Sequence, residues 1–298
     1  MDELKKYFGR ALDPIHVGAG GYRLGAVDNT IVREPATDVP KIPGTSLAGV
    51  IREFATIHTM ENDEECKKKN SEKEKRDSAE EEIKQYFGDG NRQGMLRFYD
   101  GQIIFFPVSS IQGTVWITTK ELLEYWLGEV KDKDRVKIKI PDEINDKAYA
   151  IKGVNTNRPL NLGWVLLEVE RVQNGKNVVL SSQLEQWVKR ILIVSDKLFS
   201  QIANDNLEVR TSVRINPTTG TAAEGALFTY EAIPRGTIIG FEVGIDTRRE
   251  DDKDDIASLI KATFSYLKLF GIGGLGTRGF GRIDVMELGG EGNDNQQS

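Results

Sequence analysis

The sequence contains very little cysteine and no long hydrophobic run. Its 298 residues include one cysteine, Cys66, so no disulfide can form within the chain. A single thiol in a charged stretch is typical of a reducing compartment and excludes a disulfide-stapled secreted fold. The N-terminus lacks the apolar core of a signal peptide, and no apolar run reaches the roughly 18 residues that span a membrane. We therefore expect a soluble cytoplasmic protein of one large domain or two ordinary ones.

The chain also lacks the excess of positive charge that is common in nucleic-acid-binding proteins. It has 40 Lys+Arg against 46 Asp+Glu, a net charge of −6. The acidic residues are concentrated in residues 61–89, 246–255 and 291–298, which together carry −9. The rest of the chain carries +3, so a locally basic face is compatible with an acidic whole. Net charge therefore does not exclude RNA as a partner.

Glycine, in contrast, is abundant near the C-terminus. Residues 271–285 read GIGGLGTRGFGRIDV, with six glycines and two arginines. Glycine allows a backbone to approach a ligand closely, and bare N–H groups beside arginines suit phosphates. The segment before this loop has helical apolar spacing, and the segment after it alternates like a strand. A dinucleotide fingerprint needs the opposite order, strand before helix, so we expect contact with a nucleic-acid backbone instead.

The first part of the chain has the pattern of a strand, a long loop and a helix. We predict a strand from Leu12 to about Val17 and a loop, rich in Gly, Pro and Asp, that ends at Pro43. Loops of this length inside a domain are usually functional or disordered. A helix capped by Thr45 or Ser46 follows, with one apolar face made by Leu47, Val50, Ile51, Phe54 and Ile57.

The middle and end of the chain alternate charged, apolar and turn-rich segments. Residues 61–85 predict a charged insertion, 96–108 a strand or hairpin, 118–128 a short helix and 182–194 a helix, with a less legible insertion over 130–180. Residues 207–235 alternate on both sides of strong turn chemistry and predict a protruding β-hairpin. We expect the tail, 290–298, to be disordered. Strand–helix–strand early and late fits a ferredoxin-like βαββαβ domain among several α+β folds.

Three stretches together resemble the RAMP superfamily of CRISPR proteins. They are PIHVGAGGYRLGAVDNTIVREPATDVPKIPGTSLAGVIR, VRINPTTGTAAEGALFTYEAIPRGT and GIGGLGTRGFGRIDV. The combination is similar to the repeated backbone subunit of type III-B, or Cmr-type, effector complexes. YFGDGNRQGMLRFYDGQIIFFPVSSIQGTVWIT favours type III-B over the shorter III-A subunit. The resemblance covers nearly the whole chain, apart from residues 61–82, parts of 130–180 and the tail.

The resemblance implies an α+β fold with one RRM-like palm over residues 1–298, insertions, and the hairpin as a thumb. It implies several copies stacked on one CRISPR guide RNA, with other subunits of the Cmr-type complex as partners. Complementary target RNA is then cut at six-nucleotide steps, where each thumb displaces a nucleotide. The cutting aspartate of the family corresponds to Asp28. The family commonly has lysine where Ala48 stands, which gives Arg52 more weight as a guide contact.

Asp28, His16 and Glu231 are the catalytic candidates. Taken alone, a loop aspartate before Asn29 favours an Asx turn, whereas the resemblance favours cleavage. One carboxylate is too few for a tight metal site, so we expect a weakly held Mg²⁺ or Mn²⁺ at Asp28 that shares RNA ligands. His16 and Glu231 are candidate helpers in proton transfer. Their alternatives are a packed histidine and a surface carboxylate.

The candidate guide-RNA contacts are a set of arginines and glycines: Arg52, Arg278, Arg282, Gly273, Gly274 and Gly276. A single surface arginine more often makes a weak ion pair, but a set beside a glycine loop favours phosphates. In the hairpin, Ile215, Leu227 and Phe228 are either core residues or wedges between bases. A purely structural guide-binding subunit without nuclease activity is the alternative function. A guide-precursor nuclease and a nucleotide-binding enzyme fit the motifs less well.

Overall fold

A large mixed sheet organises the computed structural model, which describes residues 3–20, 27–128, 139–172, 180–215, 218–246, 248 and 253–288. The strand order is β14 (Ile283–Glu287), β1 (Glu3–Ala11), β13 (Ile238–Ile245), β4 (Gly101–Val108), β5 (Val115–Thr118), β10 (Ile191–Ile193), β6 (Ala148–Lys152) and β9 (Val169–Arg171). Two short strands flank this path: β2 (Lys41–Ile42) pairs with β4, and β3 (Leu96–Phe98) pairs with β13. The first four strands in this order pair antiparallel.

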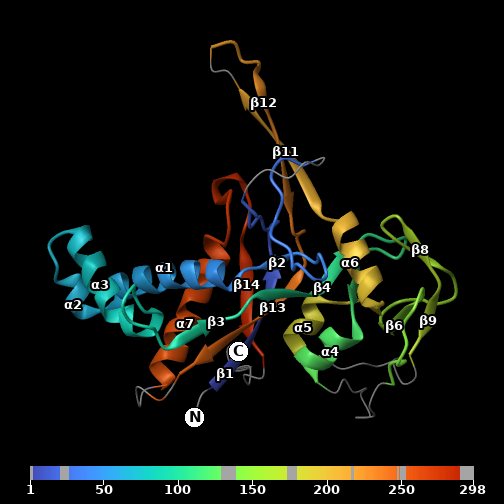
Figure 1. Cartoon of the computed structure of the whole chain (residues 1–298), viewed down its shortest axis with the longest axis horizontal. Coiled ribbons are helices and arrows are strands. Elements are labelled where there is room, and N and C mark those ends of the chain that lie inside the picture. The colour runs from blue at the N-terminus through green and yellow to red at the C-terminus, as the bar shows by residue number, and fades with distance from the viewer. Residues whose placement is uncertain are drawn as a thin grey trace, which may run out of the picture.

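Helices cover both faces of the sheet (Figure 1). The helices α1 (Gly44–Asn62) and α7 (Lys253–Leu269) pack on one face, and α4 (Lys120–Leu127) and α5 (Ser182–Trp187) pack on the other. Neighbouring residues of β1 illustrate this, because successive side chains of a strand point to opposite faces. The Tyr7 ring meets Phe264 of α7 edge-on at 5.2 Å between centroids, while the Phe8 ring lies 5.8 Å from Trp126 of α4.

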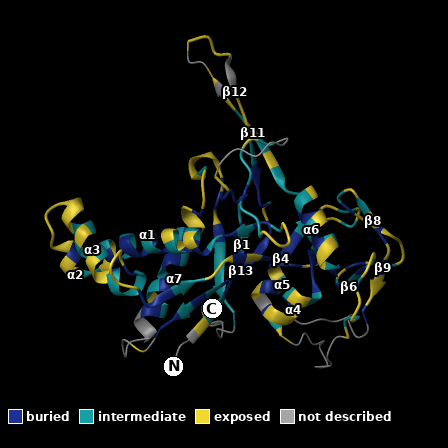
Figure 2. Cartoon of the chain, viewed as in Figure 1, coloured by how far each residue is buried: buried dark blue, intermediate teal, exposed yellow. Residues whose placement is uncertain are grey.

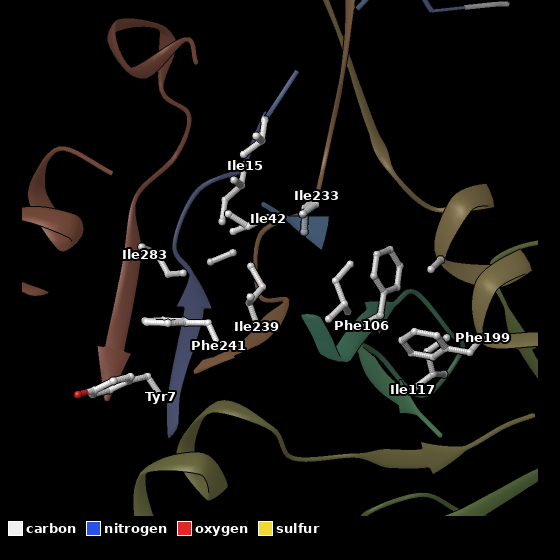
Figure 3. Packing of buried hydrophobic residues seen from close by; sticks show 14 of the residues in the cluster. Tyr7, Ile15, Ile42, Phe106, Ile117, Phe199, Ile233, Ile239, Phe241 and Ile283 are labelled. Atoms are coloured by element: carbon white, nitrogen blue, oxygen red, sulfur yellow. The ribbon is translucent and has the colours of Figure 1, made fainter. Parts of the chain in front are cut away.

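The main hydrophobic core lies between the sheet and the helices α1 and α7. It continues along the sheet to buried residues of β5, β10, β6 and β9. Figure 3 shows part of it, with Tyr7 and Phe241 stacked at 5.3 Å and Ile15 above them beside Ile233. Ile15 and Ile233 are fully buried and form an isolated antiparallel bridge. This bridge fixes the segment after β1 against the chain that leaves β12, close to the candidate site.

The strands β11 (Glu208–Ile215) and β12 (Ala222–Ala232) form a separate antiparallel pair that projects from the body of the molecule (Figure 1). Its outer part is exposed, whereas its base enters the buried centre (Figure 2). The pairing register shifts between Val213 and Ile215. The residues 216 and 217 of the predicted turn lie outside the described residues.

The charged segment after α1 folds into two helices, α2 (Glu64–Lys67) and α3 (Glu72–Phe87), which pack on α1. Arg76 of α3 donates two hydrogen bonds to Glu53 of α1, at 2.5 and 2.9 Å, and one to Glu80 within its own helix. The opposite side of the molecule contains β7 (Leu160–Leu162), β8 (Val165–Leu167) and α6 (Asp196–Asp205). The segment between α7 and β14 contains a short 3-10 helix, η2 (Gly276–Arg278).

Three sequence predictions of local structure were wrong. The first strand covers residues 3–11, not 12–17, because pairing with both β13 and β14 stabilises a segment whose lysines hide its alternation. Pro43, and not Thr45 or Ser46, stands at the cap of α1, where Asp100 Oδ1 accepts a 2.7 Å hydrogen bond from Gly44 N. The helix predicted over 182–194 ends at Trp187, and β10 follows because it pairs with β5 and β6.

Two of the segments predicted from the sequence are not fully described by the structure. Residues 129–138 and 173–179 of the predicted insertion over 130–180, and the whole of the predicted tail 290–298, lie outside the described residues. Within the part of the chain that the structure describes, no helix is both long and apolar enough to cross a membrane.

Candidate functional site

Three segments that are distant in sequence meet at residues Thr229–Glu231, which we call the hairpin base. One contains His16 and follows β1, the second contains Asp28, and the third is the glycine loop after α7. The second segment pairs with the free edge of β12. Asn29 N donates to Thr229 O at 3.0 Å, and Glu231 N donates to Asn29 O at 3.0 Å. The hairpin base is therefore the point around which the candidate residues are arranged.

Asp28 is exposed, and one of its carboxylate oxygens is held by Thr229. Asp28 Oδ2 accepts hydrogen bonds from Thr229 N and from Thr229 Oγ1, both at 2.8 Å. Asp28 N in turn donates to Thr229 Oγ1 at 2.9 Å. The hydrogen bond from the Thr229 backbone, followed by that from its hydroxyl, holds the pKa of Asp28 below its ordinary value. The carboxylate is thus ionised at neutral pH and held by a long-range contact, whereas the isolated sequence favoured a local Asx turn.

Glu231 is buried and has both carboxylate oxygens engaged. Its Oε1 accepts a 2.6 Å hydrogen bond from Arg33 Nη2, and its Oε2 accepts from Ile31 N at 3.1 Å. The Arg33 and Glu231 side chains are each 11% exposed. The structure therefore shows an internal ion pair, which neither the catalytic hypothesis nor the surface-carboxylate alternative anticipated.

His16 packs between the hairpin base and the glycine loop. Its ring meets Tyr230 edge-on at 5.7 Å, and its Nδ1 lies 2.6 Å from the carbonyl oxygen of Glu231. A carbonyl oxygen only accepts hydrogen bonds, so Nδ1 carries a proton, and in the neutral imidazole Nε2 has the lone pair. His16 is buried, which agrees with the packed-histidine alternative, and its tautomer also suits a proton acceptor at Nε2.

The glycine loop packs tightly on His16 and on itself. Gly273 has φ +86°, and a Cβ at that position would clash with the carbonyl oxygen of His16. Gly274 N donates to that same oxygen at 2.9 Å. This N–H is therefore engaged, whereas the sequence had suggested bare N–H groups in the loop. Gly276 is different, because a Cβ there would lie 3.8 Å from the nearest described atom, Phe270 O. All three glycines are exposed, so this loop presents backbone at the surface.

The two arginines of the glycine loop have different surroundings. Arg278 is exposed and reaches toward the hairpin, with Nη1 3.4 Å from Ser212 Oγ and 3.5 Å from the Tyr230 hydroxyl. Arg282 instead forms a bidentate ion pair with Asp13, at 2.5 and 3.2 Å. This pairing lowers the pKa of Asp13. Arg278 is therefore the more available of the two for a phosphate.

Arg52 lies on the first half of α1 and is half-buried. Its helix contacts the residue before the glycine loop, because the Phe54 ring is tilted against that of Phe270, with 6.2 Å between centroids. No hydrogen bond or ion pair of the Arg52 guanidinium occurs among the described residues.

The apolar residues of the hairpin are exposed and do not belong to the core. Ile215, Leu227 and Phe228 are 54%, 63% and 41% exposed. Directly opposed residues of an antiparallel pair share a face, so Val213 and Leu227 lie on the same face as Thr211 and Thr229. An exposed apolar stripe therefore begins beside Asp28 and runs outward along the hairpin.

A cleft of about 640 Å³ lies elsewhere, between the sheet and the helices α4 and α6. Its charged lining is mainly acidic, with Glu34, Asp100, Glu121 and Asp196 against Lys41. This charge disfavours phosphate groups, so we do not assign the cleft to nucleic acid.

Asp28 and Glu231 differ in how far their oxygens are occupied. No hydrogen bond of Asp28 Oδ1 occurs among the described residues, while both oxygens of Glu231 are engaged. Within the described ranges, the one group of three potential metal ligands is Asp63, Cys66 and Glu82, in the α2–α3 region. A single carboxylate oxygen fits a hard, weakly held Mg²⁺ or Mn²⁺ and does not fit a tightly bound Zn²⁺.

Sequence reasoning missed Thr229, Tyr230 and Arg33. Thr229 and Tyr230 directly precede Glu231 in TYEAIP, and Arg33 follows the Asp28 segment in TIVREP. Nothing in the local pattern shows that these residues are partners, because about 200 residues separate the two segments. Only the pairing of the Asp28 segment with the edge of β12 brings them together.

Comparisons with known proteins show which family the chain belongs to. The family model described as the RAMP superfamily matches residues 10–284. A protein of Pyrococcus furiosus named CRISPR system Cmr endoribonuclease Cmr4 is 29% identical over 301 residues, covering 93% of this chain and 94% of that protein.

Solved structures show the same fold. A chain from a type III-B Cmr-beta complex bound to cognate target RNA matches with a TM-score of 0.67 and 18% identity, over 96% of this chain and 97% of that one. A crystal structure of Cmr4 matches with a TM-score of 0.61 and 23% identity, over 96% and 99% of the two chains. The family match extends over most of the chain and includes all three segments that meet at the hairpin base. This protein is a member of the RAMP superfamily.

Proposed function

We propose that this protein is the repeated backbone subunit of a type III-B CRISPR effector complex. Several copies bind one guide RNA, together with other Cmr-type subunits, and cleave complementary target RNA at six-nucleotide intervals. Membership of the RAMP superfamily and the near full-length similarity to a Cmr endoribonuclease support this proposal.

The fold supports a ferredoxin-like, RRM-like palm with a thumb. The order β14-β1-β13-β4, with α1 between β1 and β4 and α7 between β13 and β14, corresponds to the βαββαβ pattern. The hairpin β11–β12, with its exposed apolar stripe, is the element suited to enter a guide–target duplex. Arg52, Arg278 and the exposed backbone at Gly273, Gly274 and Gly276 are the proposed guide contacts, with Arg282 secondary because Asp13 pairs with it.

One observation carries the proposal of cleavage: an ionised, exposed aspartate lies at the base of this hairpin. Asp28 has Oδ2 fixed by Thr229, and no hydrogen bond of its Oδ1 occurs among the described residues. A nucleotide displaced by the hairpin would lie beside this carboxylate. When bound at Asp28, Mg²⁺ or Mn²⁺ would neutralise charge that develops on the scissile phosphate.

The proposed reaction uses the 2′-hydroxyl of the displaced nucleotide. Its oxygen bonds to the adjacent phosphorus and the bond to the 5′-oxygen of the next nucleotide breaks. The departing 5′-oxygen takes a proton from water, so the products are a 2′,3′-cyclic phosphate and a 5′-hydroxyl. The 2′-hydroxyl proton must leave, and His16 Nε2 is the acceptor that the tautomer at Nδ1 makes available. Glu231 is proposed to hold the Asp28 segment through Arg33 and Ile31 and not to transfer protons.

The test is cleavage by the reconstituted complex with Asp28→Asn, with EDTA, and with target RNA carrying single 2′-deoxy substitutions at the cut sites. Each change should nearly abolish cutting and leave target binding intact, because pairing with the guide supplies the affinity. Full cleavage by Asp28→Asn would refute the assignment of the site. Full cleavage of the deoxy target would reject the 2′-hydroxyl and leave metal-activated water as the nucleophile. A parent complex that assembles normally but does not cut bound target would favour a purely structural subunit.

A further inference from the structure

Thr229 makes more contacts with Asp28 than any helper named from the sequence. The two residues exchange three hydrogen bonds, from Thr229 N and Thr229 Oγ1 to Asp28 Oδ2 and from Asp28 N to Thr229 Oγ1, at 2.8–2.9 Å. A threonine hydroxyl has one proton to donate and lone pairs to accept with, so it satisfies both of its roles here at once. None of these three hydrogen bonds depends on a local turn, because 201 residues separate Asp28 from Thr229.

We propose that Thr229 is the positioning residue of the cleavage site: its hydroxyl fixes the orientation of the Asp28 carboxylate so that Oδ1 faces the target RNA. This inference rests on the proposed function and deepens it. The backbone N–H of Thr229 alone leaves the carboxylate free to rotate about that single contact. The hydroxyl supplies a second donor to the same oxygen and anchors the Asp28 backbone as well, which removes that freedom.

The strand beneath Thr229 is rigid enough for this role. Two residues along β12, the buried Glu231 pairs with Arg33 and receives the N–H of Ile31. Between them, the segment of Asn29 exchanges backbone hydrogen bonds with Thr229 and Glu231. The Asp28 segment is thus fastened to β12 at both ends. At the Glu231 end the groups have little exposure to water, and buried charged hydrogen bonds of this kind are costly to break.

The attachment of Asp28 to β12 predicts where the target RNA is cut. Asp28 is attached to the same strand that carries the exposed stripe of the hairpin, since Thr229 and Leu227 lie on one face of β12. The element proposed to displace the nucleotide and the carboxylate proposed to act on it therefore move as one unit. Cutting at a fixed distance from the point of hairpin insertion is the expected result.

The experiment compares three variants in the reconstituted complex: Thr229→Val, which removes the hydroxyl at nearly constant shape, Thr229→Ser, which retains it, and Thr211→Val. Thr211 is exposed and lies directly opposite Thr229 on β11, so it controls for the same substitution on the same face. Single-turnover cleavage of bound target is measured against Mg²⁺ concentration, and guide and target binding are measured in parallel. Asp28→Asn is included to test the proposed function separately.

We expect Thr229→Val to lower the cleavage rate at subsaturating Mg²⁺ by about 10-fold, in line with the loss of one hydrogen bond to a charged group. The Mg²⁺ concentration for half-maximal cleavage should rise, while target binding stays unchanged. Thr229→Ser and Thr211→Val should behave like the parent protein.

The outcomes separate the two proposals. If Asp28→Asn cleaves normally, the proposed function fails. If Asp28→Asn is inactive but Thr229→Val matches Thr211→Val, the positioning role of Thr229 is overturned. An equal loss in Thr229→Ser and Thr229→Val also overturns it, because the hydroxyl is then not the group that matters.

Discussion

Glu231 illustrates how burial decides the role of a carboxylate. From the sequence it is one acidic residue at the exit of a hairpin, and both a catalytic and a surface role are open to it. In the structure it is 8% exposed, and its oxygens are taken by Arg33 and Ile31. An ion pair removed from water depends on its partner, because the remaining charge would be buried alone.

Glu231→Gln should therefore destabilise the protein. We expect the free energy of unfolding to fall by about 3 kcal/mol, the usual cost of breaking a buried pair, measured by urea denaturation. Glu80→Gln is the matched control, since its ion pair with Arg76 is 43% exposed on both sides and should cost less than about 1 kcal/mol. A Glu231→Gln protein of unchanged stability but reduced cleavage would instead indicate a direct chemical role.

The arginines form a second set of residues whose partners distinguish them. Arg278→Ala and Arg52→Ala should each weaken guide binding regardless of guide sequence and flatten the log–log salt dependence by roughly 0.7. Arg282→Ala should have a smaller effect, because Asp13 already pairs with that guanidinium. Arg158→Ala, on an exposed loop between β6 and β7, provides the control. Equal slopes for all four variants would contradict the proposed guide contacts.

Among the elements, the glycine loop has a structural requirement that its composition alone did not reveal. Several of its glycines are needed where the chain passes close to itself: Gly271 and Gly281 have positive φ, and a Cβ on either would clash with the other strand of the loop. Gly273 meets the His16 carbonyl in the same way. The loop is thus a packed connection that holds His16, and it exposes backbone only at some positions.

Substitution at two of these glycines should separate packing from binding. Gly273→Ala, at φ +86° and against His16 O, should lower the free energy of unfolding by about 1–3 kcal/mol. Gly276→Ala, whose Cβ would lie at an ordinary contact distance of 3.8 Å from Phe270 O, should change it by less than about 0.5 kcal/mol. Thermal unfolding of the two variants provides the measurement. If Gly276→Ala is stable yet binds guide RNA poorly, that position approaches the RNA; two equally stable variants would contradict the packing described here.

At the scale of the whole molecule, the hairpin is the element that extends beyond the body (Figure 1). Its outer apolar residues are exposed in the single chain, and it contacts the body mainly through the hairpin base. In the proposed multi-copy complex on guide RNA, a surface of this kind is suited to a head-to-tail assembly. Such heterologous contacts propagate as a filament and do not close as a dimer.

Deletion of residues 217–223 should therefore leave the monomer as stable as the parent chain, because Thr229–Glu231 and the Asp28 segment are retained. Assembly on guide RNA should weaken, or the spacing of the cleavage products should become irregular. Size-exclusion chromatography with guide RNA and mapping of the cleaved target report these two effects. Unchanged six-nucleotide products would contradict the assignment of the hairpin as a thumb.

The sequence by itself determined the features that depend on neighbouring residues and on motif order. The α7 periodicity, the turn chemistry of the hairpin, the glycine loop between helix and strand, and the family resemblance were all readable, and the family is confirmed. Asp28 could be named as a candidate because it lies within the first of the three stretches that carry the family resemblance.

Only the tertiary structure decided the partners. Thr229 holds Asp28 from 201 residues away, Arg33 neutralises Glu231 across 198, and Asp13 pairs with Arg282 across 269. Local spacing carries no signal for such pairs, since sheet pairing brings the segments together. The strand over residues 3–11 was missed for the same reason: its hydrogen bonds go to β13 and β14, at the other end of the chain.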